Sequence, residues 1–234
     1  MRGSIQLRVT SQLQAVVFDM DGVIVDSHPA HRFAWKEFLR TLGKEVSDRD
    51  LDFVMDGRKR EDILVHFLGP LSDAQLKEYG RLKNDLFWRA ASEVVPIIGA
   101  FEFIECLQLA GVPMALATSA STSRARSTLK RMGLIECFTT VVTGDEVRAG
   151  KPDPGIYQLA CRRINCPPSA AVAFEDAASG VQAAKDAGLK CVCVATNRSA
   201  ETLTAAGADC VLSNFANLTI EEFLSLVGMS PPPL

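Results

Sequence analysis

The sequence predicts an α/β protein in which a doubly wound parallel sheet carries an inserted all-helical segment. Short apolar runs alternate with amphipathic helical patterns over most of the chain, and one long interval after the first run holds helical patterns only. At about 150 residues per domain, the length of 234 residues corresponds to about 1.6 domains. This ratio fits one large domain with a smaller insert better than two equal halves.

Six short apolar runs are the predicted strands. Most are nearly continuous in Val, Ala, Leu, Phe or Cys rather than alternating between polar and apolar side chains. Strands of this kind are covered on both faces, which favours a parallel sheet between two layers of helices. In chain order, the predicted strands are Ala15–Asp19, Pro113–Ala117, Thr139–Val142, Ala171–Phe174, Lys190–Val194 and Ala208–Leu212.

Amphipathic segments between these runs are the predicted helices of the core. Apolar residues recur there at the spacing of one helix face, and one stripe consists of small residues that suit close packing on a sheet. The stripes are Ala125, Leu129 and Met132; Ile156, Leu159, Ala160 and Ile164; and the small-residue stripe Ala177, Val181, Ala184 and Gly188. Strand and helix in alternation are typical of a doubly wound α/β domain.

The interval after the first strand shows helical periodicity without a strand pattern. Its apolar stripes are Ala30, Ala34, Phe38 and Leu42, followed by Ile63, Phe67 and Leu68. We therefore predict that residues 1–26 and 96–228 form the α/β core and that residues 27–95 form a helical domain inserted into it. Residues 229–234, with three consecutive prolines, are predicted to be a disordered tail.

Composition excludes several classes of function. The chain has 25 Lys and Arg against 28 Asp and Glu, and its net charge of −3 lacks the basic excess typical of nucleic-acid binding. No apolar stretch approaches the roughly 18 residues of a membrane-spanning helix, and the first ten residues lack a secretory apolar region. The seven cysteines include no CxxC motif, so they are expected to be reduced, buried thiols. We expect a cytoplasmic monomer with no nucleic-acid or membrane partner.

Polar side chains gather after four of the predicted strands. In open α/β sheets, ligands bind at the carboxyl ends of the strands, so these residues are expected to meet at one edge of the sheet. They are Asp19 and Asp21 after the first strand, Thr118 and Ser119 after the second, Lys151 beyond the third, and Glu175 and Asp176 after the fourth.

This set of side chains has the chemistry of phosphoryl transfer. Carboxylates at one site repel one another, so they require a cation, and hard oxygen ligands suit Mg²⁺, which usually shares its shell with substrate phosphate. One carboxylate can attack phosphorus while its neighbour moves a proton, and hydroxyls and a lysine can hold the phosphoryl oxygens. Each residue alone also has a structural explanation as a helix cap, a turn former or a surface side chain. The ordered combination favours function.

The same motifs resemble those of the haloacid dehalogenase superfamily. Phe18-Asp19-Met20-Asp21-Gly22-Val23 resembles its first motif, and Thr118/Ser119, Lys151-Pro152 and Glu175-Asp176 with Gly180 resemble the others. The resemblance implies a Rossmann-like core with a helical cap. It implies Asp19 as nucleophile forming an aspartyl-phosphate, Asp21 as general acid and base, Lys151 as a catalytic and phosphate-binding residue, and Thr118 and Ser119 as phosphate-binding. Mg²⁺ would be held by Asp19, the backbone carbonyl of Asp21 and Asp176, with Glu175 as a ligand either directly or through water.

The helical segment resembles the cap of the β-phosphoglucomutase and sugar-phosphatase branch of that superfamily. The resemblance rests on His31, Trp35, Gly57 and Arg60-Glu61-Asp62, and more loosely on the stretch around Lys83. It implies that His31 lies beside Asp21 and that Arg60 and Lys83 meet the end of the substrate that is not transferred. The alternatives are that Arg60 and Lys83 are solvated helix residues and that His31 caps or packs at a helix start.

We predict an enzyme, a Mg²⁺-dependent phosphatase acting on a small phosphorylated metabolite, with a sugar phosphate as the expected substrate. The alternative is a β-phosphoglucomutase that interconverts β-glucose 1-phosphate and glucose 6-phosphate through the same intermediate. Mutases of this type usually follow the hydroxyl motif with Lys-Asn, whereas this chain reads Ala120-Ser121-Thr122-Ser123-Arg124 after Ser119, which weakens the mutase hypothesis. A binding module without turnover is the third hypothesis, but Asp19 and Lys151 are both present.

Overall fold

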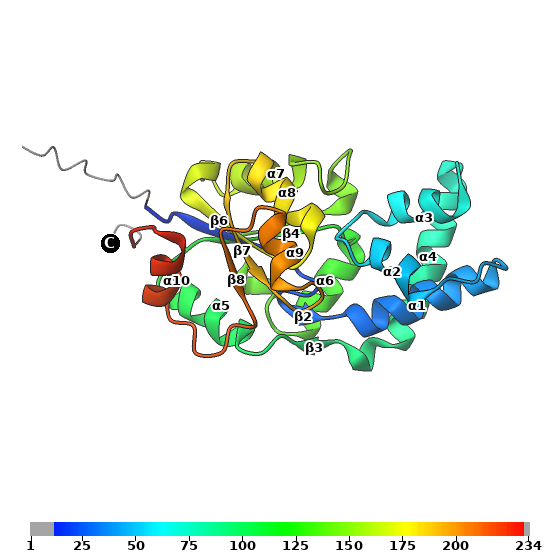
Figure 1. Cartoon of the computed structure of the whole chain (residues 1–234), viewed down its shortest axis with the longest axis horizontal. Helices are drawn as coiled ribbons and strands as arrows, with labels where there is room; N and C mark the ends of the chain where they lie inside the picture. Colours follow the sequence, from blue (N-terminus) through cyan, green and yellow to red (C-terminus); the bar gives the residue numbers. More distant parts are fainter. Residues whose placement is uncertain (1–11, 232–234) are drawn as a thin grey trace, which may run out of the picture.

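A six-stranded parallel sheet forms the centre of the protein (Figure 1). The structure, a computed structural model, describes residues 12–231. The strands lie in the order β5-β4-β1-β6-β7-β8, with β1 hydrogen-bonded to β4 on one side and to β6 on the other. Their bounds are β1 Ala15–Phe18, β4 Met114–Thr118, β5 Thr140–Thr143, β6 Ala171–Glu175, β7 Lys190–Val194 and β8 Cys210–Leu212.

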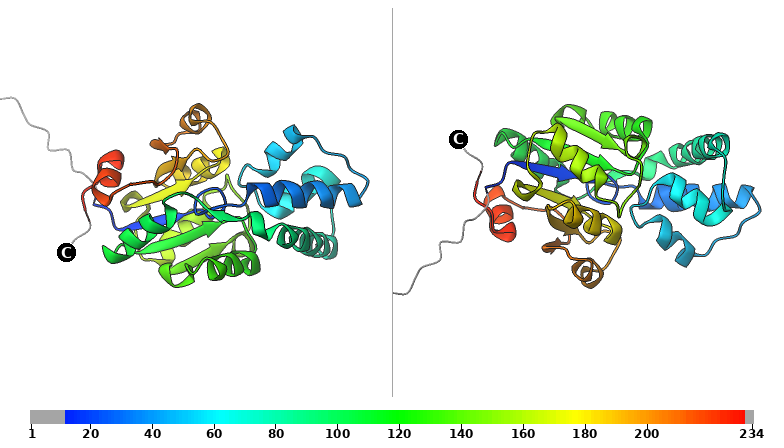
Figure 2. Two further views of the ribbon diagram at one scale, coloured as in Figure 1. Left: turned by 90° about the horizontal axis from the view of Figure 1, so that it is seen from below. Right: turned by 90° about the horizontal axis from the view of Figure 1, so that it is seen from above.

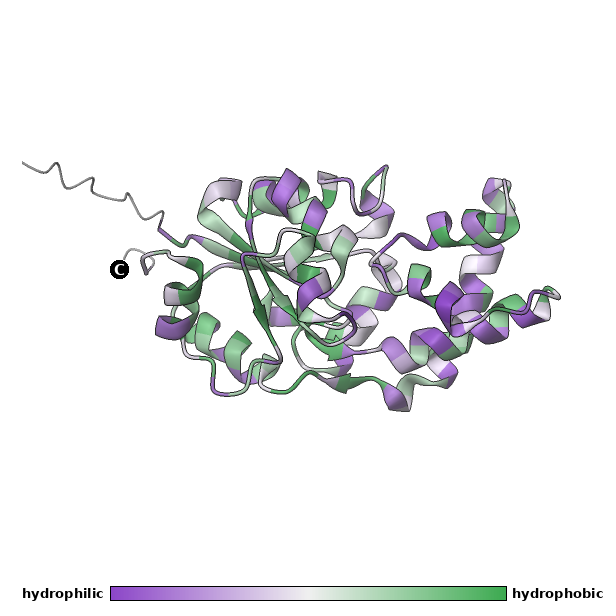
Figure 3. Ribbon diagram, viewed as in Figure 1, coloured by the Kyte–Doolittle hydropathy of each residue, from purple (hydrophilic) through white to green (hydrophobic). Residues whose placement is uncertain are grey.

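Helices cover both faces of this sheet, so the predicted fold class is confirmed. One layer contains α5 (Ala100–Leu109), α6 (Thr122–Arg131) and α10 (Ile220–Val227), and the other contains α7 (Gly155–Arg163), α8 (Ala178–Asp186) and α9 (Ala200–Ala205). Four 3₁₀ turns, Ala91–Glu93, Ile135–Cys137, Gly144–Glu146 and Pro168–Ala170, connect these elements. Hydrophobic residues concentrate on the central strands (Figure 3).

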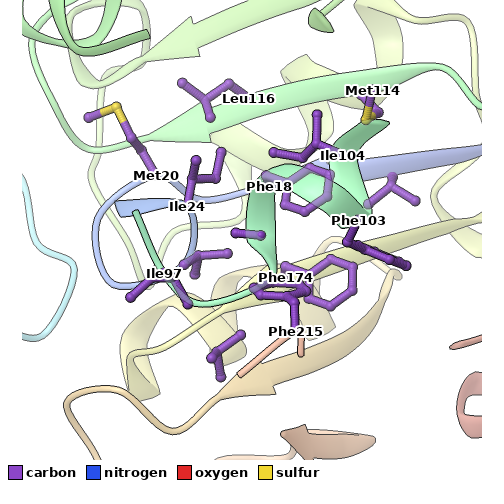
Figure 4. Close-up of a cluster of buried hydrophobic side chains, with 14 of the residues drawn as sticks. Phe18, Met20, Ile24, Ile97, Phe103, Ile104, Met114, Leu116, Phe174 and Phe215 are labelled. Atoms are coloured by element: carbon purple, nitrogen blue, oxygen red, sulfur yellow. The ribbon is translucent and has the colours of Figure 1, made fainter. Parts of the chain in front are cut away.

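The two faces of the sheet bury different kinds of side chain, because alternate residues of a strand point to opposite faces. Phe18 and Phe174 point to one face, where their rings stack at a centroid distance of 5.1 Å among further aromatic residues (Figure 4). Ala15 and Ala173 point to the other face, which is rich in alanine and cysteine. Because these side chains are small, α8 packs close to the sheet, as the predicted stripe of small residues on this helix indicates.

The helical lobe lies at the carboxyl edge of the sheet (Figure 2). It consists of α1 (His28–Thr41), α2 (Asp48–Val54), α3 (Arg60–Leu68) and α4 (Asp73–Arg89). Ser47 and Ser72 form capping boxes that start α2 and α4, and the lobe has an apolar core of its own around Trp35, Phe38 and Leu51. The division into a core of residues 1–26 and 96–228 and a cap of residues 27–95 stays a prediction, and residues 1–11 lie outside the described part.

Two very short strands join the lobe to the core. β2 (Val25–Asp26) leads into the lobe and β3 (Val95–Pro96) leads out of it, and the two pair antiparallel with Val25 opposite Pro96. Strands of two residues are too short to show an alternating pattern, so the sequence did not indicate them. Both chain crossings therefore lie side by side.

The C-terminal residues and the cysteines differ from what the sequence predicted. Met229 is buried in the apolar core, and the backbone carbonyl of Ser230 accepts a hydrogen bond of 3.0 Å from the amide of Leu13. The tail predicted to be disordered from residue 229 is therefore ordered up to Ser230, because these residues extend the packing of α10, and residues 232–234 lie outside the described part. The seven cysteines are free thiols, as expected, but Cys106 is exposed and Cys137 and Cys210 are only partly buried, unlike the buried thiols expected. Within residues 12–231, no helix is long and apolar enough to cross a membrane.

Candidate active site

A cleft lies where the helical lobe meets the carboxyl edge of the sheet. The core contributes Asp19, Asp21 and Arg124 to its lining, and the lobe contributes His31, Arg60 and Lys83. Clefts at this edge are the usual ligand sites of open α/β sheets, because strand ends and helix starts converge there. The sequence placed its candidate residues at this edge, and the structure brings them to it.

Lys151 is a buried cation that contacts Asp19, one of the residues lining the cleft. Its Nζ donates to Asp19 Oδ1 at 2.6 Å, to Glu175 Oε1 at 2.5 Å and to the carbonyl of Ala117 at 3.3 Å. Tyr157 donates its hydroxyl to the same Glu175 oxygen at 2.6 Å. Burial opposes protonation of Lys151, but the charges of Asp19 and Glu175 outweigh it and raise its pKa. Lys151 is therefore held as an ammonium between the carboxyl groups of Asp19 and Glu175.

Asp19 lies at the end of β1 in a strongly desolvated position. Burial raises its pKa to about 8, and although Lys151 lowers the pKa, the neighbouring carboxylates of Glu175, Asp21 and Asp176 raise it. Lys151 alone therefore does not offset the effects of burial and of the neighbouring carboxylates on Asp19. A cation placed beside Asp19 would favour its ionised form, which is the form required of a nucleophile.

Asp19, Glu175 and Asp176 form a cluster that fits a divalent cation. Each offers an oxygen within 4.8 Å of the others, and all three side chains are buried. The three carboxyl groups face the ammonium of Lys151 and the imidazole of His28, and a divalent cation bound among them would favour the ionised form of all three. The buried Oδ2 of Asp176 lies 3.1 Å from His28 Nε2 and accepts no well-aligned hydrogen bond among the described residues. The convergence of three buried carboxyl groups on one point is the observation that supports a metal here.

Gly22 makes room for this cluster. It has a φ of +75°, and a Cβ built there would lie 2.1 Å from Asp176 Oδ2 and 2.6 Å from the ring of His28. Any larger residue would push the carboxylate away, so the glycine of the first motif has a steric role. His28 was not among the residues predicted for the site, yet its Nε2 lies 3.1 Å from Asp176 Oδ2. Burial lowers the pKa of His28, but Asp176 outweighs burial and raises it.

Asp21 has a different environment from Asp19. Arg124 holds both of its carboxylate oxygens, with Nη1 2.8 Å from Oδ1 and Nη2 2.5 Å from Oδ2, and Ser27 donates its hydroxyl to Oδ1 at 2.6 Å. Burial opposes ionisation, but the charge and hydrogen bonds of Arg124 dominate and hold the pKa of Asp21 well below its usual range. The sequence did not identify Arg124 as a site residue.

His31 and Lys83 come from the lobe and lie beside Asp21. Lys83 Nζ lies 2.8 Å from His31 Nδ1, and His31 Nε2 lies 3.6 Å from Asp21 Oδ1. Lys83 is buried and faces the rings of Trp35 and Phe87. Burial and the charge of Lys83 lower the pKa of His31 to about 3, so the imidazole is neutral. Lys83 is therefore a buried partner of His31 rather than a solvated helix residue, and its contact with substrate stays a prediction.

The remaining predicted residues differ in how they face the cleft. Ser119 lines the cleft, and its hydroxyl donates to the carbonyl of Gly57 in the lobe at 2.6 Å. Thr118 is the last residue of β4, is fully buried and accepts a hydrogen bond from the amide of Ala120. Arg60 lines the cleft on the lobe side and donates to Glu61 at 2.6 Å. The geometry thus favours Ser119 over Thr118 as the hydroxyl that reaches a ligand.

Comparison with known proteins decides the family. Residues 13–188 match the haloacid dehalogenase-like hydrolases. The chain belongs to this family. It is 33% identical over 211 residues to validoxylamine A 7'-phosphate phosphatase of Streptomyces hygroscopicus subsp. limoneus, covering 88% of this chain and 95% of that protein. It is 34% identical over 179 residues to the phosphorylated carbohydrates phosphatase of Thermotoga maritima, covering 76% and 83%.

The haloacid dehalogenase-like fold extends over almost the whole chain. A crystal structure of β-phosphoglucomutase from Clostridium difficile superposes with a TM-score of 0.83 and 20% identity, covering 92% of this chain and 97% of that one. The family and branch suggested by the motifs are thereby confirmed. The roles of individual residues in this haloacid dehalogenase-like hydrolase stay predictions, which the geometry above makes specific.

Two side chains of the core form hydrogen bonds to the backbone of the lobe in this conformation. After β7, Asn197 donates to the carbonyl of Met55 at 3.1 Å and Arg198 donates to the carbonyl of Asp52 at 2.6 Å. Both acceptors lie on or just after α2, the helix that precedes the Gly57 loop. These two side chains tie the lobe to the core on the opposite side of the cleft from Arg124.

Proposed function

We propose that this haloacid dehalogenase-like hydrolase is a Mg²⁺-dependent phosphatase that acts on a phosphorylated carbohydrate through an aspartyl-phosphate on Asp19. The observation that carries the proposal is the contrast between the two aspartates of the first motif. Asp19 lies in the acidic cluster beside Lys151, whereas Asp21 is bound by Arg124. Pairs of titratable groups in such different environments are typical of a nucleophile and a separate proton-transfer group. The phosphatase relatives support the same chemistry.

In the first step, an oxygen of Asp19 forms a bond to phosphorus while the bond from phosphorus to the sugar oxygen breaks. Arg124 favours the ionised form of Asp21, so the proton that Asp21 gives to that leaving oxygen is the one it took from water in the second step of the preceding turnover. In the second step, Asp21 takes a proton from water as the water oxygen attacks phosphorus, and the bond to Asp19 breaks to release phosphate. Lys151 stays protonated throughout and holds Asp19 in place.

The proposed metal site consists of Asp19, Glu175, Asp176 and the backbone carbonyl of Asp21. Bound Mg²⁺ supplies positive charge beside the phosphoryl oxygens, as it does in other phosphoryl-transfer sites. Ser119, which lines the cleft, is the candidate for holding a phosphoryl oxygen, and Thr118 is the neighbouring buried hydroxyl.

The helical lobe is proposed to act as a cap over the substrate. The contacts of Asn197 and Arg198 with the lobe describe a closed arrangement, in which displacement of bulk water would strengthen the electrostatic interactions of the site with the substrate. Arg60 faces the cleft from the lobe and is proposed to meet the sugar part of the substrate. We further propose a cytoplasmic enzyme that acts as a monomer on a small metabolite, without a nucleic-acid partner.

Turnover of p-nitrophenyl phosphate with Mg²⁺ tests the nucleophile. Asp19→Asn is expected to abolish it, because an amide oxygen does not form the aspartyl-phosphate. Asp85→Asn is the matched control, since Asp85 is exposed at the lobe surface and, within residues 12–231, pairs only with Arg81. Activity of Asp19→Asn comparable to that of the control would contradict the proposal.

Incubation with β-glucose 1-phosphate and a glucose bisphosphate primer separates hydrolysis from isomerisation. A phosphatase releases inorganic phosphate, whereas a mutase accumulates glucose 6-phosphate. We expect phosphate, because the chain lacks the Lys-Asn pair after its hydroxyl motif. A panel of phosphorylated sugars and polyols, ranked by kcat/KM, then identifies the substrate.

A further inference from the structure

Arg124 links three parts of the molecule at one point. It comes from α6 of the core, is 5% exposed, and reaches Asp21, which is 103 residues away in the sequence. Its guanidinium group also lies 5.2 Å from the ring of Phe87, a fully buried residue of the lobe. Arg124 therefore contacts the lobe through one side and the carboxylate of Asp21 through its N–H groups.

The contacts of Asp21 distinguish its two oxygens. A carboxylate offers about four lone-pair directions, two on each oxygen. Oδ1 accepts from Arg124 Nη1 at 2.8 Å and from Ser27 Oγ at 2.6 Å, with His31 Nε2 3.6 Å away. Oδ2 accepts only from Arg124 Nη2, at 2.5 Å, among the described residues. One lone pair of Oδ2 thus accepts no hydrogen bond from the described residues, and Asp21 lines the cleft.

The bidentate contact of Arg124 fixes the orientation of the Asp21 carboxyl group as well as its position. Ser27 alone restrains one oxygen and leaves the carboxyl plane free to rotate about the bond between Cβ and Cγ. The planar guanidinium group of Arg124 sets that plane, because two parallel N–H groups meet both oxygens at once. A lysine in its place would supply charge without this constraint.

We propose that Arg124 is a positioning residue that orients the carboxyl group of Asp21 so that Oδ2 exchanges the proton with the leaving oxygen and with water. The inference rests on the proposed function, in which Asp21 transfers that proton. The first motif, which contains Asp19 and Asp21, gives no indication of this role, because Arg124 lies on α6, far from the motif in the sequence.

The test compares two substrates with different leaving groups. The kcat/KM value reports the steps up to transfer of the phosphoryl group to Asp19. Glucose 6-phosphate has an alkoxide leaving group that needs the proton, whereas the p-nitrophenolate of p-nitrophenyl phosphate leaves without one. Arg124→Ala is expected to lower kcat/KM about 100-fold for glucose 6-phosphate and less than about 10-fold for p-nitrophenyl phosphate. Guanidinium chloride at millimolar concentration is expected to restore part of the loss.

Arg131→Ala is the matched control. Arg131 also lies on α6, and its guanidinium group packs on Trp88 of the lobe, but it does not contact Asp21. Its two kcat/KM values are expected to stay within about twofold of the wild type, because surface substitutions away from a site have small effects. Arg124→Lys is expected to keep the fold and most of the leaving-group dependence of Arg124→Ala.

The outcomes are distinguishable. Equal losses on both substrates, a rise in KM without a fall in kcat, or wild-type behaviour of Arg124→Lys would overturn the positioning role. The Asp21→Asn variant distinguishes failure of the positioning role of Arg124 from failure of the proposed function. If Asp21→Asn shows the leaving-group dependence and the Arg124 variants do not, only the role of Arg124 is wrong; if Asp21→Asn shows none, the acid–base role of Asp21 is wrong. Where Arg124→Ala does not fold, Arg124→Lys and Arg124→Gln carry the comparison.

Discussion

Replacement of Lys151 by methionine tests how the floor of the site is held together. Methionine has a similar length but carries no charge, so the substitution removes the ammonium and little volume. Nζ of Lys151 lies 2.6 Å from Asp19 and 2.5 Å from Glu175, and Lys151 is 2% exposed, Asp19 6% and Glu175 1%. Removing one partner of a buried ion pair leaves an unpaired buried charge, which costs about 3–5 kcal/mol.

The loss of stability should depend on pH. Burial raises the pKa of Asp19 to about 8, so the folded protein holds a proton on Asp19 that the unfolded chain has lost above its pKa of 3.8. Stability from this group therefore falls as pH rises from 3.8 through about 8. Without Lys151 the pKa of Asp19 is expected to rise further, since the ammonium is what lowers it. The cost of Lys151→Met should thus be larger at pH 8.5 than at pH 6.

Urea unfolding followed by circular dichroism in EDTA measures these free energies. Lys185→Met is the matched control, because Lys185 forms an ion pair of 2.7 Å with Asp209 at the surface, where both side chains are about one-third exposed. Exposed pairs contribute at most about 1 kcal/mol. The reasoning is wrong if Lys151→Met costs no more than Lys185→Met, or if its cost is the same at both pH values.

Three further predictions concern the rest of the site. Gly22→Ala is expected to weaken Mg²⁺ binding at least about tenfold in titration calorimetry, because the added Cβ meets Asp176 Oδ2 at 2.1 Å; unchanged affinity would contradict this. Burial lowers the pKa of His31 to about 3, so below pH 6.5 the unfolded chain binds a proton that the folded protein does not. The free energy of unfolding should therefore fall by about 1.4 kcal/mol per pH unit below pH 6.5 because of this residue. In urea unfolding, His31→Gln should remove this part of the difference between about pH 6.5 and pH 5. Arg198→Ala removes a hydrogen bond of 2.6 Å to the carbonyl of Asp52 and should raise KM for p-nitrophenyl phosphate up to about fivefold; a wild-type KM would count against the closed arrangement.

The carboxylates of the site were predictable because sheet topology places them. Asp19 and Asp176 each follow a continuous apolar run, and the carboxyl ends of parallel strands meet at one edge whatever the intervening loops do. The same logic located Lys151 only approximately, since it lies beyond a 3₁₀ turn after its strand, and its contact with Glu175 needed the structure.

Residues that act through side-chain direction were not predictable. Arg124 reaches Asp21 only because of how α6 is rotated on the sheet, and apolar periodicity gives that rotation too coarsely to aim a guanidinium group. His28 follows a two-residue strand that no pattern revealed. The choice between Thr118 and Ser119 depends on where β4 ends, because a shift of one residue turns a side chain to the opposite face.

The pairing of β2 with β3 has a consequence for how such proteins change over evolution. Val25 lies opposite Pro96 and Asp26 opposite Val95, so the chain leaves the core and returns to it at neighbouring points. The lobe is therefore an insertion whose two ends meet at the core, like the ends of a loop. The entropic cost of closing a loop grows only slowly with its length, by about 0.6 kcal/mol per doubling. A tight hairpin turn, a longer bundle or an unrelated fold inserted here would leave the sheet almost unperturbed. Substrate preference can therefore diverge by exchange of one module, while the residues that break the phosphate ester stay on the other.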